Sequence, residues 1–306
     1  MTERPDQSPI TSPRSERVRK VAALTGRSAR RKQQRFRIEG PQAIRSLLTH
    51  RAELAVEVFT TARAAAAHPE LTGLARDAGV PVREVEEQII RAMVRENGPE
   101  GEPADGTGTA DRTAGASATT SLVSPQGVLA LGRLPAETVT DALIAIGNLP
   151  VGRPVTVVVL HEVRDPGNVG TLIRTADAAG ADLVVLTRTC ADPYAPKAVR
   201  AAVGSLFHLP VVTGAEITEV LDGLAEADVT AAATSGYAHS ELFTAELPTR
   251  LAWILGNEAH GLDERTLAAA PLAVRIPLAG HAESLNVHTA ATVCLFETLR
   301  RRQAGE

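Results

Sequence analysis

Aromatic residues, cysteines and long apolar runs are all scarce in this sequence. Of its 306 residues, 3% are aromatic and two are cysteines, Cys190 and Cys294. Neither cysteine lies in a metal-ligand pattern, and so few cysteines exclude a disulfide framework and indicate an intracellular protein. No apolar run is long enough to cross a bilayer, and residues 1–13 lack the apolar core of a signal peptide. We therefore expect a cytoplasmic protein that has no membrane partner.

The length of the chain predicts two domains, because a single hydrophobic core rarely extends over roughly 300 residues. Residues 1–13 are polar and punctuated by proline, which predicts a disordered tail. Residues 14–133 form the predicted first domain, within which residues 98–120 are a flexible, low-complexity insertion. Residues 134–152 are weakly amphipathic and are predicted to link this domain to a second one, residues 153–306.

Both domains show the alternation of helical and strand-like segments that is typical of α/β folds. The second domain opens at residues 155–163 with an almost continuous run of apolar, mostly β-branched residues. Such a run is typical of a strand buried on both faces of a parallel sheet. The segments that follow predict a doubly wound parallel sheet for this domain, and a smaller α/β fold is predicted for the first.

The net charge of −4 conceals a basic block near the N-terminus. Twelve arginines and lysines lie from Arg14 to Arg51, against two glutamates. Such a block attracts phosphate backbones and makes nucleic acid the leading class of partner. We predict that its central residues contact phosphates; they are Arg30, Arg31, Lys32 and Arg35. The alternative is a solvated helix face that binds nothing.

The first segment that can carry chemistry is HEVRDPGNVG, which joins the buried strand to a predicted helix. Asn168 lies at the entrance of that helix and Arg174 lies within its first two turns. Both are expected near the carboxyl end of the sheet, where α/β domains bind ligands. A dinucleotide-binding interpretation fails because the sequence has no GxGxxG here. For Arg174 a surface ion pair remains the alternative.

The second segment is LGNEAHGL, residues 255–262. A strand that ends at Gly256 and Asn257 allows a ligand to approach the backbone closely, and Glu258 is placed to orient a cation or a ribose. An ordinary glycine turn is the alternative.

The third segment is the long stretch IPLAGHAESLNVHTAATVCLFETLRRR, residues 276–302. A polar loop leads through Ser284, Leu285 and Asn286 into apolar residues at helical spacing, so a C-terminal helix is predicted. Serine and asparagine are favoured as caps at the start of a helix. A capping role and a role in a functional site are therefore both open for these residues.

These segments, in this order and at this separation, resemble the three motifs of the SpoU, or TrmH-like, RNA ribose methyltransferases of the SPOUT superfamily. The matching stretches are NVGTLIRTADAAGA, ILGNEAHGL and IPLAGHAESLNVHTAATVCLFE. The similarity covers about residues 155–302 and includes KAVRAAVGSLFHLPV between the first two motifs. Residues 15–131 resemble the family's N-terminal substrate-binding domain, which is similar to a ribosomal protein that grips folded RNA.

The resemblance implies a parallel sheet whose C-terminal segment is threaded through a loop to form a deep trefoil knot, an exception to the rule against threaded chains. It also implies S-adenosyl-L-methionine bound in the knot and a homodimer whose active sites use both chains. Cofactor contacts are then expected from Thr234, Leu255, Gly256, Asn257, Ile276, Leu278 and Leu285. The polar active-site positions correspond to Asn168, Arg174, Glu258, Ser284 and Asn286.

One departure from the family's pattern is visible at His288 and Thr289, where smaller residues are usual. For His288 we expect a role in helix packing, with a contact to RNA as the alternative.

The resemblance implies transfer of a methyl group from S-adenosyl-L-methionine to a ribose 2′-hydroxyl, without a metal. A guanidinium is essentially always protonated, so Arg174 is expected to stabilise a developing alkoxide or position a phosphate rather than act as a base. Ribosomal RNA is the expected substrate because the first domain resembles those of rRNA-modifying members. A transfer RNA 2′-O-methyltransferase and a catalytically silent RNA-binding or ribosome-assembly protein are the alternatives.

Overall fold

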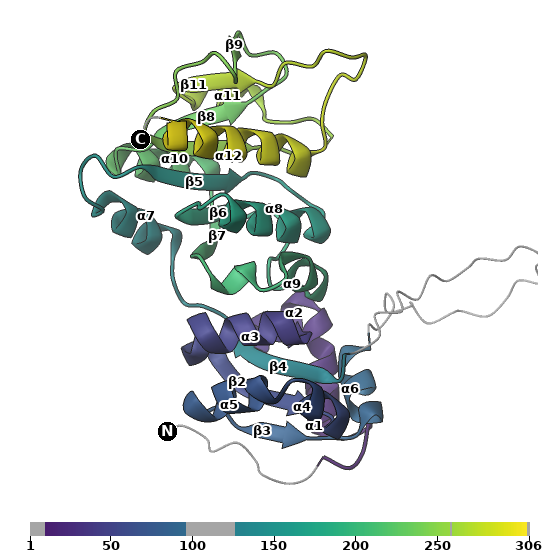
Figure 1. The fold of residues 1–306 in the computed structure, drawn as a ribbon. Coiled ribbons are helices and arrows are strands. Elements are labelled where there is room, and N and C mark those ends of the chain that lie inside the picture. The colour runs from purple at the N-terminus through teal and green to yellow at the C-terminus, as the bar shows by residue number, and fades with distance from the viewer. Residues whose placement is uncertain (1–9, 96–125, 258, 305–306) are drawn as a thin grey trace, which may run out of the picture.

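The computed structural model describes residues 10–95, 126–257 and 259–304. They form two α/β domains that are stacked on one another, the N-terminal domain below and the C-terminal domain above in Figure 1. The predicted insertion and most of the predicted N-terminal tail lie outside the described residues. None of the described helices is long and apolar enough to span a membrane.

The first domain is built on a four-stranded sheet of order β1-β4-β2-β3, in which β2 and β3 pair in parallel and the other pairs are antiparallel. The predicted alternation of helices and strands is confirmed here. The elements are α1 (Glu16–Ala22), η1 (Ala23–Thr25), α2 (Arg27–Gln33), β1 (Arg35–Glu39), α3 (Pro41–His50), η2 (Ala52–Leu54), β2 (Ala55–Thr60), α4 (Ala62–Ala67), α5 (Pro69–Asp77), β3 (Val82–Glu84), α6 (Glu87–Val94) and β4 (Val128–Arg133).

The second domain is built on a seven-stranded parallel sheet of order β7-β6-β5-β10-β8-β11-β9. The elements are α7 (Val139–Gly147), β5 (Val155–Leu160), α8 (Pro166–Ala178), β6 (Leu183–Thr187), α9 (Pro196–Ala202), η3 (Ser205–Phe207), β7 (Val211–Ala215), α10 (Ile217–Glu226), β8 (Thr230–Thr234), β9 (Ser240–Glu241), β10 (Arg250–Leu255), α11 (Glu264–Ala269), β11 (Leu272–Arg275) and α12 (Val287–Ala304).

The strand β5 is buried on both faces, as its apolar run predicts. Val158 and Leu160 belong to the core on the side of α8, α9 and α12. Val157 and Val159 point the other way, into the core shared with α7 and α10. Because successive side chains of a strand point to opposite faces, an unbroken apolar run fits only a strand covered on both sides. The second domain is therefore a three-layer structure, as predicted.

The expected linker, residues 134–152, contains the helix α7, which is packed onto the second domain. Thr138 caps α7 by accepting a hydrogen bond from the Asp141 backbone amide at 3.1 Å. Val139, Leu143 and Ile146 lie in the same core as one face of β5. This part of the chain is thus a layer of the second domain. Its amphipathic pattern is weak because apolar residues also lie on its solvent side, such as Ile144, which is 58% exposed.

The junction between the two domains is apolar at its centre and charged around it. The Phe36 ring of β1 lies 4.9 Å from the Tyr194 ring and 6.3 Å from the Phe207 ring, centroid to centroid. These residues belong to one hydrophobic cluster that runs through both domains. Arg200 of α9 forms an ion pair with Glu39 of β1 at 3.1 Å. The first domain is therefore packed on α9 and η3 through a continuous hydrophobic core, and the two domains are not joined by a linker alone.

The C-terminal helix α12 is packed across the sheet. Trp253 of β10 is completely buried, and its indole N–H donates a hydrogen bond to the Thr298 hydroxyl at 3.0 Å. The end of the helix is fixed by Arg302, which donates to the Val155 carbonyl at 2.8 Å. Two arginines near this end, Arg300 and Arg301, bind Glu297 and lower the pKa of that carboxyl to about 2.

Close packing of α8 on α9 depends on a glycine. A Cβ atom at Gly170 would lie 2.3 Å from the Ala198 carbonyl oxygen and 2.7 Å from the Ala201 Cβ. These atoms belong to the backbone and to a short side chain, so neither can rotate away. The two helices can therefore approach this closely only if residue 170 is glycine.

We predict that Gly170→Ala lowers the free energy of unfolding by about 1–3 kcal/mol, because the added methyl group must push α9 away from α8. Gly73 of α5 is the matched control, since a Cβ atom there would meet nothing within 4 Å. Gly73→Ala should stabilise the protein by about 0.5–1 kcal/mol through the higher helix propensity of alanine. Denaturant unfolding followed by circular dichroism measures both changes, and equal effects of the two variants would contradict the packing argument.

Candidate active site

The predicted catalytic and cofactor-binding residues that the structure describes lie on segments at the carboxyl ends of the parallel strands. This edge of the sheet is where β5 leads into α8, β10 ends in the turn after Leu255, and β11 leads through residues 276–286 into α12. In Figure 1 it is the side towards which the β5 arrow points. Loops at this edge are the usual ligand-binding elements of α/β domains.

The start of α8 is fixed by a charged cap. The Asp165 carboxylate accepts a hydrogen bond from the Asn168 backbone amide at 2.8 Å, and Pro166 occupies the first turn. The same carboxylate receives a hydrogen bond from the Lys197 ammonium at 2.6 Å. This bond holds the pKa of Asp165 below its usual value. Asn168 therefore sits in the first turn of a firmly capped helix, as its position in the motif predicts.

Arg174 lies on the exposed side of α8, and the residue after it ties this helix to α12. The Thr175 hydroxyl lies 2.9 Å from the His288 Nε2 atom. The His288 backbone amide donates to the Asn286 side-chain oxygen at 2.9 Å. Asn286 thus caps α12, and His288 joins the two helices, which is the packing role predicted for it. Arg174 and the loop before α12 are consequently held on the same part of the surface.

The turn after β10 is closed by its own backbone. Asn257 and Gly261 exchange two backbone hydrogen bonds, of 3.0 and 2.9 Å. The side-chain amide of Asn257 also donates to the Glu162 carbonyl at 3.0 Å, which links this turn to the loop before α8. A Cβ atom at Gly256 would lie 2.5 Å from the Gly261 carbonyl carbon, so glycine is required by the turn itself. Glu258, predicted as an active-site residue, lies outside the described residues.

The remaining predicted cofactor residues line the same edge with different exposures. Leu255 is buried, and the Thr234 hydroxyl donates to the Ile254 carbonyl at 3.0 Å, so both support the ends of their strands. Ile276 is partly buried against the core, whereas Leu278 is 39% exposed. Ser284 is exposed and Leu285 half-buried in a loop without helix or strand structure. The loop therefore presents apolar side chains to a ligand, together with a backbone that belongs to no helix or strand.

The predicted phosphate-binding cluster is divided by the structure. Arg31, Lys32 and Arg35 are exposed on α2 and β1. Arg30, in contrast, is 2% exposed and donates two hydrogen bonds to the Asp192 carboxylate, at 2.7 and 3.0 Å. It also donates to the carbonyls of Leu24 and Thr25. The prediction that Arg30 contacts phosphates is therefore wrong, because its guanidinium is buried and hydrogen-bonded in the junction between the domains.

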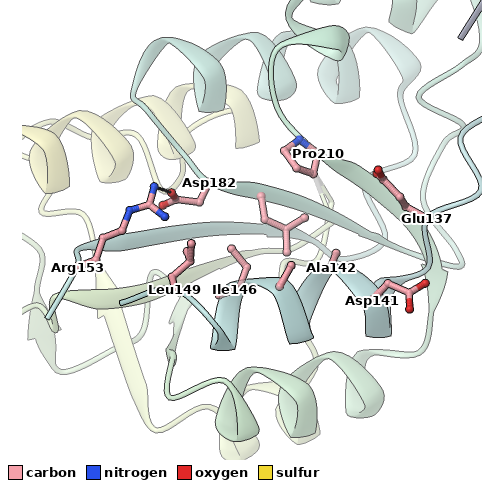
Figure 2. A pocket seen from close by; sticks show the side chains of 10 residues that line it. Glu137, Asp141, Ala142, Ile146, Leu149, Arg153, Asp182 and Pro210 are labelled. Carbon is pink, nitrogen blue, oxygen red and sulfur yellow. Dashed lines mark hydrogen bonds and ion pairs between the residues drawn. The ribbon is translucent and has the colours of Figure 1, made fainter. Parts of the chain in front are cut away.

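A pocket of about 360 Å³ lies at the opposite edge of the sheet, between α7 and the amino ends of β5, β6 and β7 (Figure 2). An ion pair of 2.8 Å between Arg153 and Asp182 closes one end of it, and Glu137 and Asp141 stand at the other. Its acidic rim is unsuited to a phosphate backbone, and it contains none of the predicted site residues.

Comparison with known proteins relates both domains to RNA methylation. The sequence model of the SpoU rRNA Methylase family matches residues 155–296, and that of the MRM3-like substrate binding domain matches residues 15–104. A 23S rRNA guanosine 2′-O-methyltransferase of a Burkholderia species is 36% identical over 177 residues, which are 58% of this chain and 70% of that protein. A 23S rRNA uridine 2′-O-methyltransferase of Streptomyces viridochromogenes is 33% identical over 60% of this chain and 63% of its own length.

A solved structure extends the likeness to both domains. The rRNA methyltransferase of Sinorhizobium meliloti, determined with bound AdoMet, superposes with a TM-score of 0.76 at 26% identity, covering 96% of this chain and 98% of that one. The matched regions include the three segments whose residues meet at the carboxyl edge of the sheet. The chain belongs to the SpoU rRNA methylase family.

Proposed function

We propose that this protein transfers a methyl group from S-adenosyl-L-methionine to a ribose 2′-hydroxyl of ribosomal RNA. The observation that carries the proposal is the junction of α8 with the start of α12 through Thr175 and His288. It brings the helix that bears Arg174 to the loop that bears Ser284, at the edge where the turn after β10 also lies. Family membership and the AdoMet-bound neighbour support this assignment.

The residues at this edge fit the proposed cofactor. The loop 276–286 is free of regular structure, and its exposed Leu278 and half-buried Leu285 offer apolar surface to an adenosine group. Gly256 and Ile276 would contribute backbone and apolar contacts, while Thr234, Leu255 and Asn257 hold the strand ends in place. When bound, S-adenosyl-L-methionine supplies an electrophilic methyl carbon on a sulfonium.

The chain's own polar groups would orient and activate the ribose. A ribose hydroxyl is a poor nucleophile, so the site must hold it in line and stabilise the charge that develops on its oxygen. The Arg174 guanidinium suits stabilisation of that charge or of the adjacent phosphate. Asn168 and Ser284 would hold the ribose, with Glu258 in the same role, while Asn286 fixes the loop through its hydrogen bond to His288.

The exposed cations of the first domain, Arg31, Lys32 and Arg35, would bind the RNA backbone. The Streptomyces and Burkholderia relatives are both named for 23S rRNA, which favours ribosomal over transfer RNA. We propose that the protein works in the cytoplasm as a homodimer, for which the exposed Phe296 supplies apolar surface on α12. The trefoil knot of the family is part of this proposal.

We predict that Arg174→Ala lowers the single-turnover rate of methyl transfer to rRNA by on the order of a hundredfold or more, because it removes charge stabilisation made mainly in the transition state. Affinity for S-adenosyl-L-methionine, measured by calorimetry, should stay unchanged. Arg153→Ala, at the opposite edge of the sheet, is the control and should transfer normally. A normal rate in the Arg174 variant would remove this residue from the catalytic centre.

We predict that replacing Arg31, Lys32 and Arg35 together by alanine weakens RNA binding and reduces its salt dependence by roughly one unit of slope for each lost phosphate contact. The matched control replaces Arg63, Arg76 and Arg91, which are exposed on other helices of the same domain. Fluorescence anisotropy with a 23S rRNA transcript at several salt concentrations measures both slopes. If the two triple variants lose the same slope, the cluster is an ordinary solvated face.

A further inference from the structure

Lys197 lies directly beside the candidate active site. It is the first residue of the matched stretch KAVRAAVGSLFHLPV but was not predicted as a site residue. It stands in the first turn of α9, and its ammonium reaches the Asp165 carboxylate at the cap of α8. Its side chain crosses Gly167, where a Cβ atom would lie 3.1 Å from the Lys197 Cε atom. Asn168 is the next residue. The lysine therefore places a positive charge across the start of the helix that carries Asn168 and Arg174.

This charge is available to a second partner. The Lys197 side chain is 59% exposed and that of Asp165 is 43% exposed. Ion pairs as exposed as this one contribute little to stability, because water solvates both partners well. Asp165 accepts the Asn168 amide through Oδ1 and the Lys197 ammonium through Oδ2, so the cap does not depend on the lysine. A phosphate can consequently replace Asp165 as the partner of the Lys197 ammonium without disturbing the helix cap.

The basic helix of the first domain lies on the same side of the molecule. In Figure 1, α2 lies directly against the end of the second domain that is formed by α9. The buried pair of Arg30 and Asp192 fixes this placement, because Asp192 lies in the loop that leads into α9. That loop is fixed in turn by the Ala191 amide, which donates to the Val163 carbonyl at 2.9 Å. The exposed Arg31 and Lys32 are thus held at a set position relative to Lys197.

We propose that Lys197 binds an RNA phosphate next to the target ribose and that it continues, across the junction of the domains, the phosphate-binding surface of Arg31 and Lys32. Asp165 holds the ammonium in place until RNA arrives, and the Arg30–Asp192 pair keeps the two parts of the surface in register. The proposal rests on the proposed function, since it assumes that RNA reaches the start of α8.

Two variants that break the same ion pair test this proposal. Lys197→Met removes the positive charge and keeps the aliphatic packing over Gly167. Asp165→Asn removes the competing negative charge and keeps a side chain that caps helices well. A purely structural ion pair predicts that both variants behave alike. A phosphate-binding lysine predicts opposite effects on RNA affinity.

The measurement is fluorescence anisotropy of a labelled 23S rRNA transcript, titrated with each full-length variant at several salt concentrations. We expect Lys197→Met to weaken binding and reduce the salt slope by roughly one unit, and Asp165→Asn to tighten binding. Thermal unfolding of both variants verifies the fold. Effects in the same direction, or an unchanged affinity in Lys197→Met, would overturn the proposal.

Methyl transfer by the wild-type protein is measured separately with labelled S-adenosyl-L-methionine and the same transcript. Absence of transfer would contradict the proposed function, whereas the two binding titrations still decide the role of Lys197. If the wild type transfers methyl groups, Lys197→Met should raise the KM for RNA much more than it lowers kcat. A loss confined to kcat would place Lys197 outside RNA binding.

Discussion

The close approach of α8 to α9 is the contact on which both the junction of the domains and the candidate site depend. It is possible only because Gly170 leaves room for the Ala198 carbonyl. On its other side, α8 is bonded to α12 through Thr175 and His288. The loop that enters α9 holds the first domain through Asp192. One helix therefore sets the positions of the proposed catalytic residues, the C-terminal helix and the first domain together.

This arrangement explains why charges are buried where the two domains meet. The Arg30 guanidinium donates hydrogen bonds to the Asp192 carboxylate and to two backbone carbonyls, so its buried charge is compensated. Breaking one member of such a pair leaves the other charge uncompensated, which costs far more than an exposed pair does. The orientation of the first domain is consequently fixed by directional bonds in addition to the apolar contact of Phe36 with Tyr194.

Local patterns were sufficient to predict most elements of the second domain. The almost continuous apolar, mostly β-branched run of residues 155–160 predicts a strand covered on both faces, and this prediction is confirmed. The start of α12 was readable because an asparagine before a helical pattern suits a cap, and Asn286 does cap it. The family resemblance implied that the three motifs share one site. The structure places all three after carboxyl ends of parallel strands, at one edge of the sheet.

Features that depend on distant partners were not readable in this way. A run of basic residues predicts solvent exposure, and Arg30 departs from this only because Asp192, 162 residues away in the sequence, lies against it. The close contact at Gly256 was expected from a ligand, whereas the Gly261 backbone already makes it. Lys197 was not predicted as a site residue, because its contacts with Asp165 and over Gly167 join separate segments of the chain. The weak pattern of residues 134–152 likewise concealed a helix that covers the sheet.

The buried hydrogen bond between Trp253 and Thr298 makes the C-terminal helix visible to a spectroscopist. Trp253 is the single tryptophan of the sequence, and its indole is wholly enclosed between β10 and α12. Its emission therefore reports on one contact rather than on an average over the molecule. Undocking of α12 would expose the indole to water and shift its emission to longer wavelength, whatever happens in the first domain. The chain thus contains an intrinsic fluorescent probe for the docking of α12 on the sheet.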